Sequence, residues 1–97
     1  MDGDGLARSG AAGAARGKAV RSIEAGSPAS GTIIEVGDVV KRIDGHAIAD
    51  VLDYMYHSYG RRPLVELRGR GGGAKLVRFR KREGEDLGLR FEEPLMD

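Results

Sequence analysis

The sequence of 97 residues contains no cysteine, no tryptophan and two histidines, His46 and His57. The absence of cysteine excludes disulfides, a thiolate nucleophile, cysteine-ligated zinc and iron–sulfur clusters within these residues. Two histidines without a neighbouring carboxylate cluster do not predict a metal site. We therefore expect a domain that holds no cofactor, and we take a cytoplasmic location as the default.

Long hydrophobic runs are also missing. No stretch approaches the roughly 20 apolar residues of a transmembrane helix, and the first residues lack the apolar segment of a secretory signal. Hydrophobic residues make up 40% of the chain and charged residues 32%, with two Phe and three Tyr. This composition predicts one small globular domain with a mainly aliphatic core and no membrane partner.

Glycine and alanine dominate residues 1–18. Such a segment cannot bury enough apolar surface to offset the entropy lost on ordering. We expect a disordered leader over residues 1–18 and a folded domain over residues 19–97.

Turn signals divide the rest of the chain into short strands. Val39, Val40 and Ile43 are β-branched and lie between Gly37 and the tight-turn dipeptide Asp44-Gly45, which predicts a strand over 38–43. Ser27 and Pro28 favour a short helical turn, with Ser27 as its N-cap. The other predicted strands are 19–23, 63–68, 75–81 and 87–91, with a hairpin turn over 69–73.

One helix is predicted over 51–59, with Asp50 as its N-cap and Gly60 after its end. Its apolar stripe is expected to comprise Leu52, Met55 or Tyr56, and Tyr59. The expected core gathers apolar residues from all the elements: Val20, Ile23, Ile34, Val39, Ile43, Ile48, Leu52, Tyr56, Leu67, Val77, Leu87 and Leu89 or Phe91.

The order of these elements resembles that of a PDZ domain. The resemblance rests on Ser27-Pro28-Ala29, on the amphipathic helix, and on the run Gly37-Asp38-Val39-Val40-Lys41-Arg42-Ile43-Asp44-Gly45, where Asp44 replaces the usual Asn. Asp86-Leu87-Gly88-Leu89-Arg90-Phe91 is similar to the Gly-Leu-Gly-Phe-like loop and strand, here late in the chain. The resemblance implies an α+β fold in circularly permuted order: a partly open antiparallel β-barrel or sandwich of about five or six strands, one main helix and one short helical turn.

A closer similarity covers roughly residues 19–97. Asp50-Val51-Leu52-Asp53-Tyr54, the segment 85–92 and Pro94-Leu95-Met96-Asp97 resemble a bacterial group with an N-terminal PDZ-like domain and a following radical-SAM-like iron–sulfur region of poorly defined function. In that group the cluster cysteines come soon after this point. The resemblance implies a non-enzymatic module of a larger parent protein that carries the iron–sulfur chemistry.

The resemblance also implies a groove between helix 51–59 and strand 87–91 that binds an extended peptide by strand addition. The backbone N–H groups of Leu87, Gly88 and Leu89 would receive a carboxylate, although Glu85 and Asp86 place like charge nearby. The expected partner is a protein or peptide, including the C-terminal remainder of the parent chain. The implied peptide-binding residues are Asp86, Leu87, Gly88, Leu89, Arg90 and Phe91, with Asp53 and His57 from the helix.

Two alternatives remain open at this stage. Asp53 and His57 could simply lie on a solvated helix face. The basic run 61–82, opposed only by Glu66, could make the domain a nucleic-acid-binding or ribosome-facing module. The purely structural interpretation of that run is an exposed hairpin whose cations protect a sheet edge from aggregation.

Overall fold

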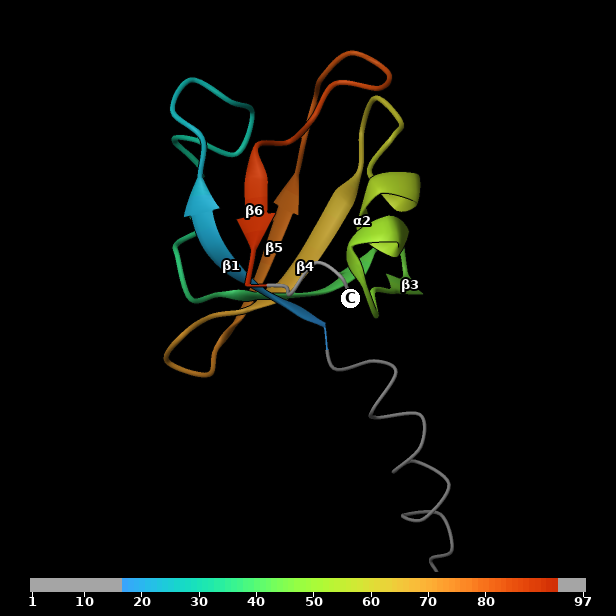
Figure 1. The fold of residues 1–97 in the computed structure, drawn as a ribbon. Helices are drawn as coiled ribbons and strands as arrows, with labels where there is room; N and C mark the ends of the chain where they lie inside the picture. Colours follow the sequence, from blue (N-terminus) through green and yellow to red (C-terminus); the bar gives the residue numbers. More distant parts are fainter. Residues whose placement is uncertain (1–16, 93–97) are drawn as a thin grey trace, which may run out of the picture.

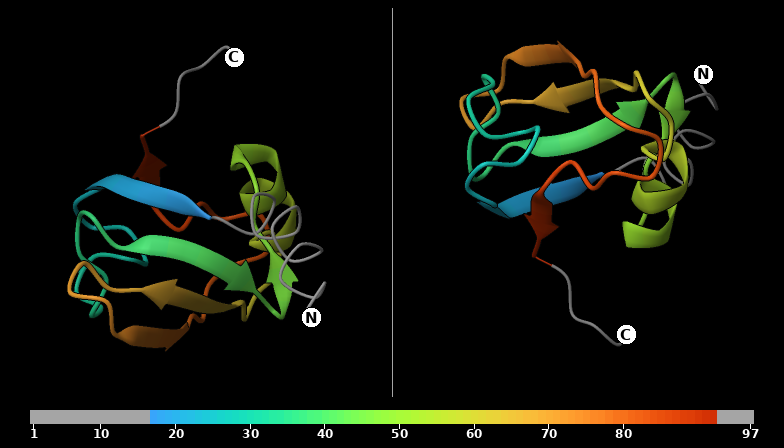
Figure 2. Two further views of the ribbon diagram at one scale, coloured as in Figure 1. Left: turned by 90° about the horizontal axis from the view of Figure 1, so that it is seen from below. Right: turned by 90° about the horizontal axis from the view of Figure 1, so that it is seen from above.

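The computed structural model describes residues 17–92, and within them the chain forms six strands and one helix (Figure 1). The helix, α2, spans Val51–His57 and lies at one end of the sheet (Figure 2). The strands are β1 (Lys18–Ile23), β2 (Val39–Ile43), β3 (His46–Ala47), β4 (Leu64–Arg68), β5 (Ala74–Arg78) and β6 (Leu89–Phe91).

All paired strands are antiparallel, and the main path through the sheet runs β5-β4-β2-β1-β6, with β3 paired to β2. The left view of Figure 2 shows the five strands of this path side by side in that order. The sheet does not close, so β5 and β6 are its edges. This arrangement confirms the predicted α+β class with a partly open antiparallel sheet.

The turn after β2 has the conformation that its sequence predicts. Asp44 and Gly45 have φ values of +51° and +83°, and Ile43 lies opposite His46 in the β2–β3 hairpin. Positive φ at both central residues is the requirement of a type I′ turn, which Asp-Gly tolerates well. The Asp44 carboxylate also accepts a hydrogen bond from the Leu64 N–H at 3.0 Å, which links the turn to β4.

The predicted inward face of the helix is wrong. Leu52 and Tyr56 are 72% and 77% exposed, whereas Tyr54 is 4% exposed and Ser58 is buried. The stripes Leu52–Met55–Tyr59 and Val51–Tyr54–Ser58 share the same helical spacing, so periodicity alone does not choose between them. The helix also ends earlier than predicted, with Ser58 as its C-cap.

The core otherwise follows the sequence closely. Val20, Ile34, Ile43, Ile48, Leu67, Val77, Leu87, Leu89 and Phe91 are buried as predicted, while Ile23 and Val39 are partly buried. Five further buried apolar residues were absent from the expected core: Ala29, Val40, Tyr54, Val65 and Pro63, which directly precedes β4. Phe79 is buried too, as the alternation of the predicted strand 75–81 indicates.

The Ser27-Pro28-Ala29 segment forms successive turns and no helix. The Ser27 hydroxyl donates to the Glu24 carbonyl at 2.7 Å, so it does not act as an N-cap. The Ala29 N–H donates to the Leu87 carbonyl at 2.9 Å. Gly88 has φ +95°, and a Cβ at this position would collide with the Ser27 side chain. The segment therefore packs behind the Leu87-Gly88 loop and holds it in place.

Most of the predicted leader, residues 1–16, lies outside the described residues, and Lys18 already belongs to β1. In the part of the chain that the structure describes, no helix is long and apolar enough to cross a membrane.

Candidate functional site

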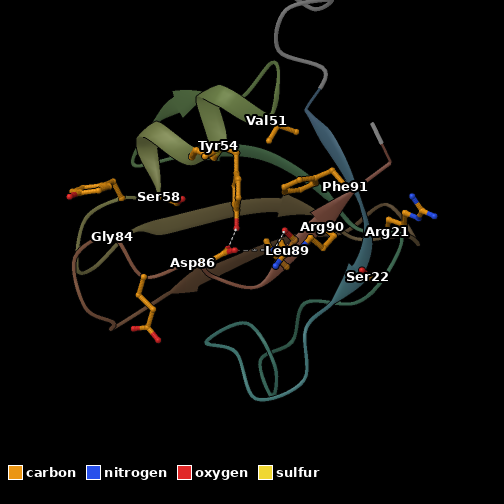
Figure 3. A pocket seen from close by; sticks show the side chains of 13 residues that line it. Arg21, Ser22, Val51, Tyr54, Ser58, Gly84, Asp86, Leu89, Arg90 and Phe91 are labelled. Carbon is orange, nitrogen blue, oxygen red and sulfur yellow. Dashed lines mark hydrogen bonds and ion pairs between the residues drawn. The ribbon is translucent and has the colours of Figure 1, made fainter. Parts of the chain in front are cut away.

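A groove of about 950 Å³ lies between α2 and β6 (Figure 3). One wall is the helix, the other is β6 with the adjoining part of β1, and the loop before β6 closes one end. The apolar part of the lining consists of Val51, Tyr54, Met55, Tyr59, Leu89 and Phe91. Polar or charged side chains come from Arg21, Ser22, Ser58, Glu85, Asp86 and Arg90.

The edge of β6 that faces away from β1 pairs with no other strand among residues 17–92, although the Leu89 carbonyl accepts a hydrogen bond from Arg90 at 3.2 Å. The Gly88 carbonyl accepts from Glu24 N–H at 2.8 Å, and Glu92 N–H donates to the Ala19 carbonyl at 3.1 Å, so both point toward β1. Backbone groups alternate along a strand, and Arg90 is in register with Ser22 of β1. The N–H and C=O groups of Leu89 and Phe91 consequently point away from β1.

Tyr54 crosses the groove from the helix to the base of β6. Its ring packs edge-on against Phe91, with centroids 4.7 Å apart and an interplanar angle of 74°. Its hydroxyl donates to the Asp86 carboxylate at 3.4 Å, as Figure 3 shows. The aromatic pair makes a hydrophobic floor, since such an arrangement is favourable beyond its buried area.

The Asp86 carboxylate collects hydrogen bonds at the loop end of the groove. Oδ1 accepts from the Gly88 N–H at 2.9 Å and from the Tyr54 hydroxyl, while Oδ2 accepts from Arg90 at 3.0 Å. Arg90 also bonds Glu24 of the β1 end at 2.8 Å. The Asp86 side chain thus links α2, the loop before β6 and β6 itself.

These contacts shift two pKa values in opposite directions. Burial raises the pKa of the Tyr54 phenol well above its ordinary value, and the negative charge of Asp86 raises it further. For Asp86, partial burial opposes ionisation, but the Gly88 N–H and the Arg90 guanidinium outweigh it and lower the pKa of the carboxyl. Asp86 is therefore ionised and Tyr54 neutral near pH 7.

The structure brings together four of the predicted site residues, Asp86, Leu89, Arg90 and Phe91, in the lining of the groove. Leu87 and Gly88 are buried behind it and do not line it. The Gly88 N–H, which was expected to receive a ligand carboxylate, is bonded to Asp86.

Asp53 and His57 lie outside the groove lining. The Asp53 N–H donates to the Asp50 side chain at 2.8 Å, and the Asp53 carboxylate accepts from the Ala49 N–H at 3.0 Å. This reciprocal pair caps the start of α2 in the manner of a capping box. The His57 ring stacks on His46 of β3, with centroids 4.3 Å apart.

Of the helix residues that line the groove, Tyr54 was not expected from the sequence, whereas Met55 and Tyr59 belong to the predicted stripe. A signal was present: Val51, Tyr54 and Ser58 share one face, and the Tyr54 ring is amphipathic enough to be buried with its hydroxyl on a partner. It could not be separated from the competing stripe without knowledge of where the sheet lies.

The basic run divides into separate places on the surface. Arg61, Arg62, Arg80 and Lys81 surround a hollow of about 400 Å³ beyond the C-terminal end of α2. Lys75 is instead bonded to the buried Asp38 at 2.6 Å. Among residues 17–92 no group of three or more His, Cys, Asp or Glu side chains could hold a metal ion.

Comparison with known proteins supports the fold. No protein-family model matches the sequence, and no curated protein is significantly similar to it. The structure is similar to the crystal structure of the PDZ domain of the SdrC-like protein from Listeria innocua, with a TM-score of 0.66 and 22% sequence identity. The similarity covers 84% of this chain and 99% of that one. The chain thus has a PDZ-like fold, with an open sheet of antiparallel strands and one helix beside its edge strand.

Proposed function

We propose that this domain is a non-enzymatic protein-interaction module that binds an extended polypeptide in the groove between α2 and β6. The observation that carries the proposal is the edge of β6 beside the groove, which has no partner strand among residues 17–92 and along which the Phe91 N–H and C=O point away from β1. A polypeptide strand placed there would extend the sheet antiparallel or parallel to β6, with backbone hydrogen bonds providing affinity.

The helix supplies the side-chain contacts in this proposal. Met55 and Tyr59 line the groove and are each 57% exposed, so a ligand can cover them. Tyr54 and Phe91 provide a rigid floor beneath. Pockets of this kind for alternate ligand side chains are what gives strand addition its sequence selectivity.

The test compares two substitutions on one helix. A random peptide library is selected on the domain, and the affinities of the enriched peptides are measured by fluorescence polarisation. Met55→Asp, inside the groove, is expected to weaken binding at least about tenfold, because a charge must be desolvated against the ligand. Leu52→Asp is the control, since Leu52 is 72% exposed and lies outside the groove. Equal losses in both variants would refute the assignment of the site.

A second candidate function, nucleic-acid binding, has one observation in its favour. Arg61, Arg62, Arg80 and Lys81 converge on one hollow. Clustered cations bind the phosphates of nucleic acids, and such binding is strongly salt-dependent. Titration of a short single-stranded RNA at two salt concentrations tests it. Loss of salt-sensitive binding in Arg61→Ser/Arg80→Ser, but not in Arg68→Ser, would establish this site.

The larger parent protein with a radical-SAM-like iron–sulfur region stays a prediction. If this module belongs to such a protein, the polypeptide in the groove would be either a separate partner or the remainder of the parent chain. Adding that remainder in trans and measuring whether it binds at the groove residues would distinguish between these two occupants.

A further inference from the structure

The loop end of the groove already contains a carboxylate, that of Asp86. It lies where the loop leads into β6. It accepts hydrogen bonds from the Gly88 N–H, the Tyr54 hydroxyl and one guanidinium nitrogen of Arg90. Three donors at this end, the Gly88 N–H, the Tyr54 hydroxyl and Arg90, are therefore engaged within the chain.

The Tyr54 side chain also blocks part of the loop end of the groove. This side chain is buried, and its hydroxyl donates to the Asp86 carboxylate. The Leu89 N–H, which points away from β1, lies within hydrogen-bonding reach of the same phenol oxygen. The Tyr54 side chain thus covers the Leu89 N–H, the first backbone donor of β6 that points away from β1. Phe91, the next outward residue, lies farther from the loop.

The charge around this end reinforces the point. Glu85 and Asp86 both line the groove there, and Arg90 is shared between Asp86 and Glu24. Arg21, the other cation in the lining, lies on the far side of Arg90 from Asp86 in Figure 3. Lys81, outside the lining, interacts electrostatically with three carboxylates at once, those of Glu83, Glu85 and Asp86. A free α-carboxylate placed at the loop would meet like charge and would find no free donor on Gly88.

We propose that the groove accepts an internal, extended segment of a polypeptide and rejects a free carboxyl terminus, with Asp86 as the residue that sets this specificity. The inference rests on the proposed function and adds the class of ligand to it. The segment would pair with β6 mainly through Phe91, and its chain would continue past the loop end without placing a charged terminus against Asp86.

The experiment displays the same random eight-residue segments in two forms. In one form the segment ends in a free carboxylate, and in the other it is flanked on both sides by a Gly/Ser linker. The wild-type domain is expected to enrich only the flanked form, with at least about tenfold weaker binding when a selected segment is made to end in a free carboxylate at the loop. Asp86→Ala, which frees the Gly88 N–H, is expected to narrow or reverse this difference.

Asp86→Asn is the companion variant, because it keeps an acceptor for Gly88 while it removes the charge. It also serves if Asp86→Ala does not fold, and an intermediate preference is expected from it. Enrichment of free-carboxylate segments by the wild-type domain, with binding lost on C-terminal amidation, would overturn the specificity and leave the proposed function standing. Enrichment of neither form would overturn both.

Discussion

Asp38 is fully buried and accepts a 2.6 Å hydrogen bond from the Lys75 ammonium, which joins the start of β2 to the β4–β5 hairpin. The same carboxylate accepts from the backbone N–H groups of Glu35 and Arg70. Burial opposes its ionisation, but these donors together lower the pKa of the Asp38 carboxyl. The aspartate of the Gly37-Asp38 dipeptide therefore has a structural role, since it links the start of β2 to the β4–β5 hairpin.

Removal of this carboxylate should be costly. Asp38→Ala leaves two backbone N–H groups without their acceptor and leaves the Lys75 ammonium with only the Ile33 carbonyl and the more distant Glu35 carboxylate. We expect a loss of about 3 kcal/mol in the free energy of unfolding. Chemical denaturation measures it. Glu66→Ala, which breaks the exposed ion pair with Arg42 at 3.2 Å, is the control and should cost less than about 1 kcal/mol. Similar costs for the two variants would contradict this account of Asp38.

Gly88 should not tolerate a side chain. It has φ +95°, and an added Cβ would collide with Ser27. We expect Gly88→Ala to lower stability by about 3 kcal/mol, from backbone strain and steric overlap together. Gly31→Ala, also at positive φ but with open space around the added atom, should cost only about 1 kcal/mol. Thermal unfolding of both variants tests this, and equal shifts in Tm would argue against the close packing of the Ser27 segment on the loop.

Tyr54 should make stability sensitive to alkaline pH. Its pKa is raised in the folded state, so its contribution is fully present below the unfolded value of about 10 and is lost as pH rises above that value. The difference in tyrosinate absorbance between wild type and Tyr54→Phe is expected to show no ionisation of Tyr54 near pH 10 while the protein stays folded. Ionisation of Tyr54 at a pH near the ordinary pKa of tyrosine would show that its hydroxyl is not buried beside Asp86.

Asp53 is expected to affect stability and not ligand binding. Asp53→Ala removes the acceptor of the Ala49 N–H at the start of α2 and should cost about 1 kcal/mol. The affinity of a peptide selected on the domain should stay within about twofold of wild type. A tenfold loss of affinity in a folded Asp53→Ala domain would instead return Asp53 to the binding site.

The strand β2 and the turn that follows it could be predicted from the sequence because their signals are local, whereas the short strand β3 was not predicted. Asp44-Gly45 demands a tight turn, and Val39, Val40 and Ile43 fit a buried strand whatever surrounds them. These features place β2 and its turn almost to the residue.

The groove could be predicted only in part, because its main contacts join residues far apart in the sequence. Leu89 and Phe91 were identified from the family-like loop. Tyr54 was not, since its contact with Asp86 spans 32 residues and depends on which face of α2 meets the sheet. Helical spacing is the same for the exposed and the buried stripe, so the choice is made by tertiary packing.

The most direct test of the groove is amide hydrogen exchange at Phe91, with and without a saturating peptide selected on the domain. The Phe91 N–H points away from β1, so a ligand strand should slow its exchange at least about tenfold. Arg90, whose N–H faces β1, provides the internal control and should change little. Protection of Phe91 over Arg90 is the predicted result. Unchanged exchange at Phe91 under saturating ligand would contradict strand addition to β6.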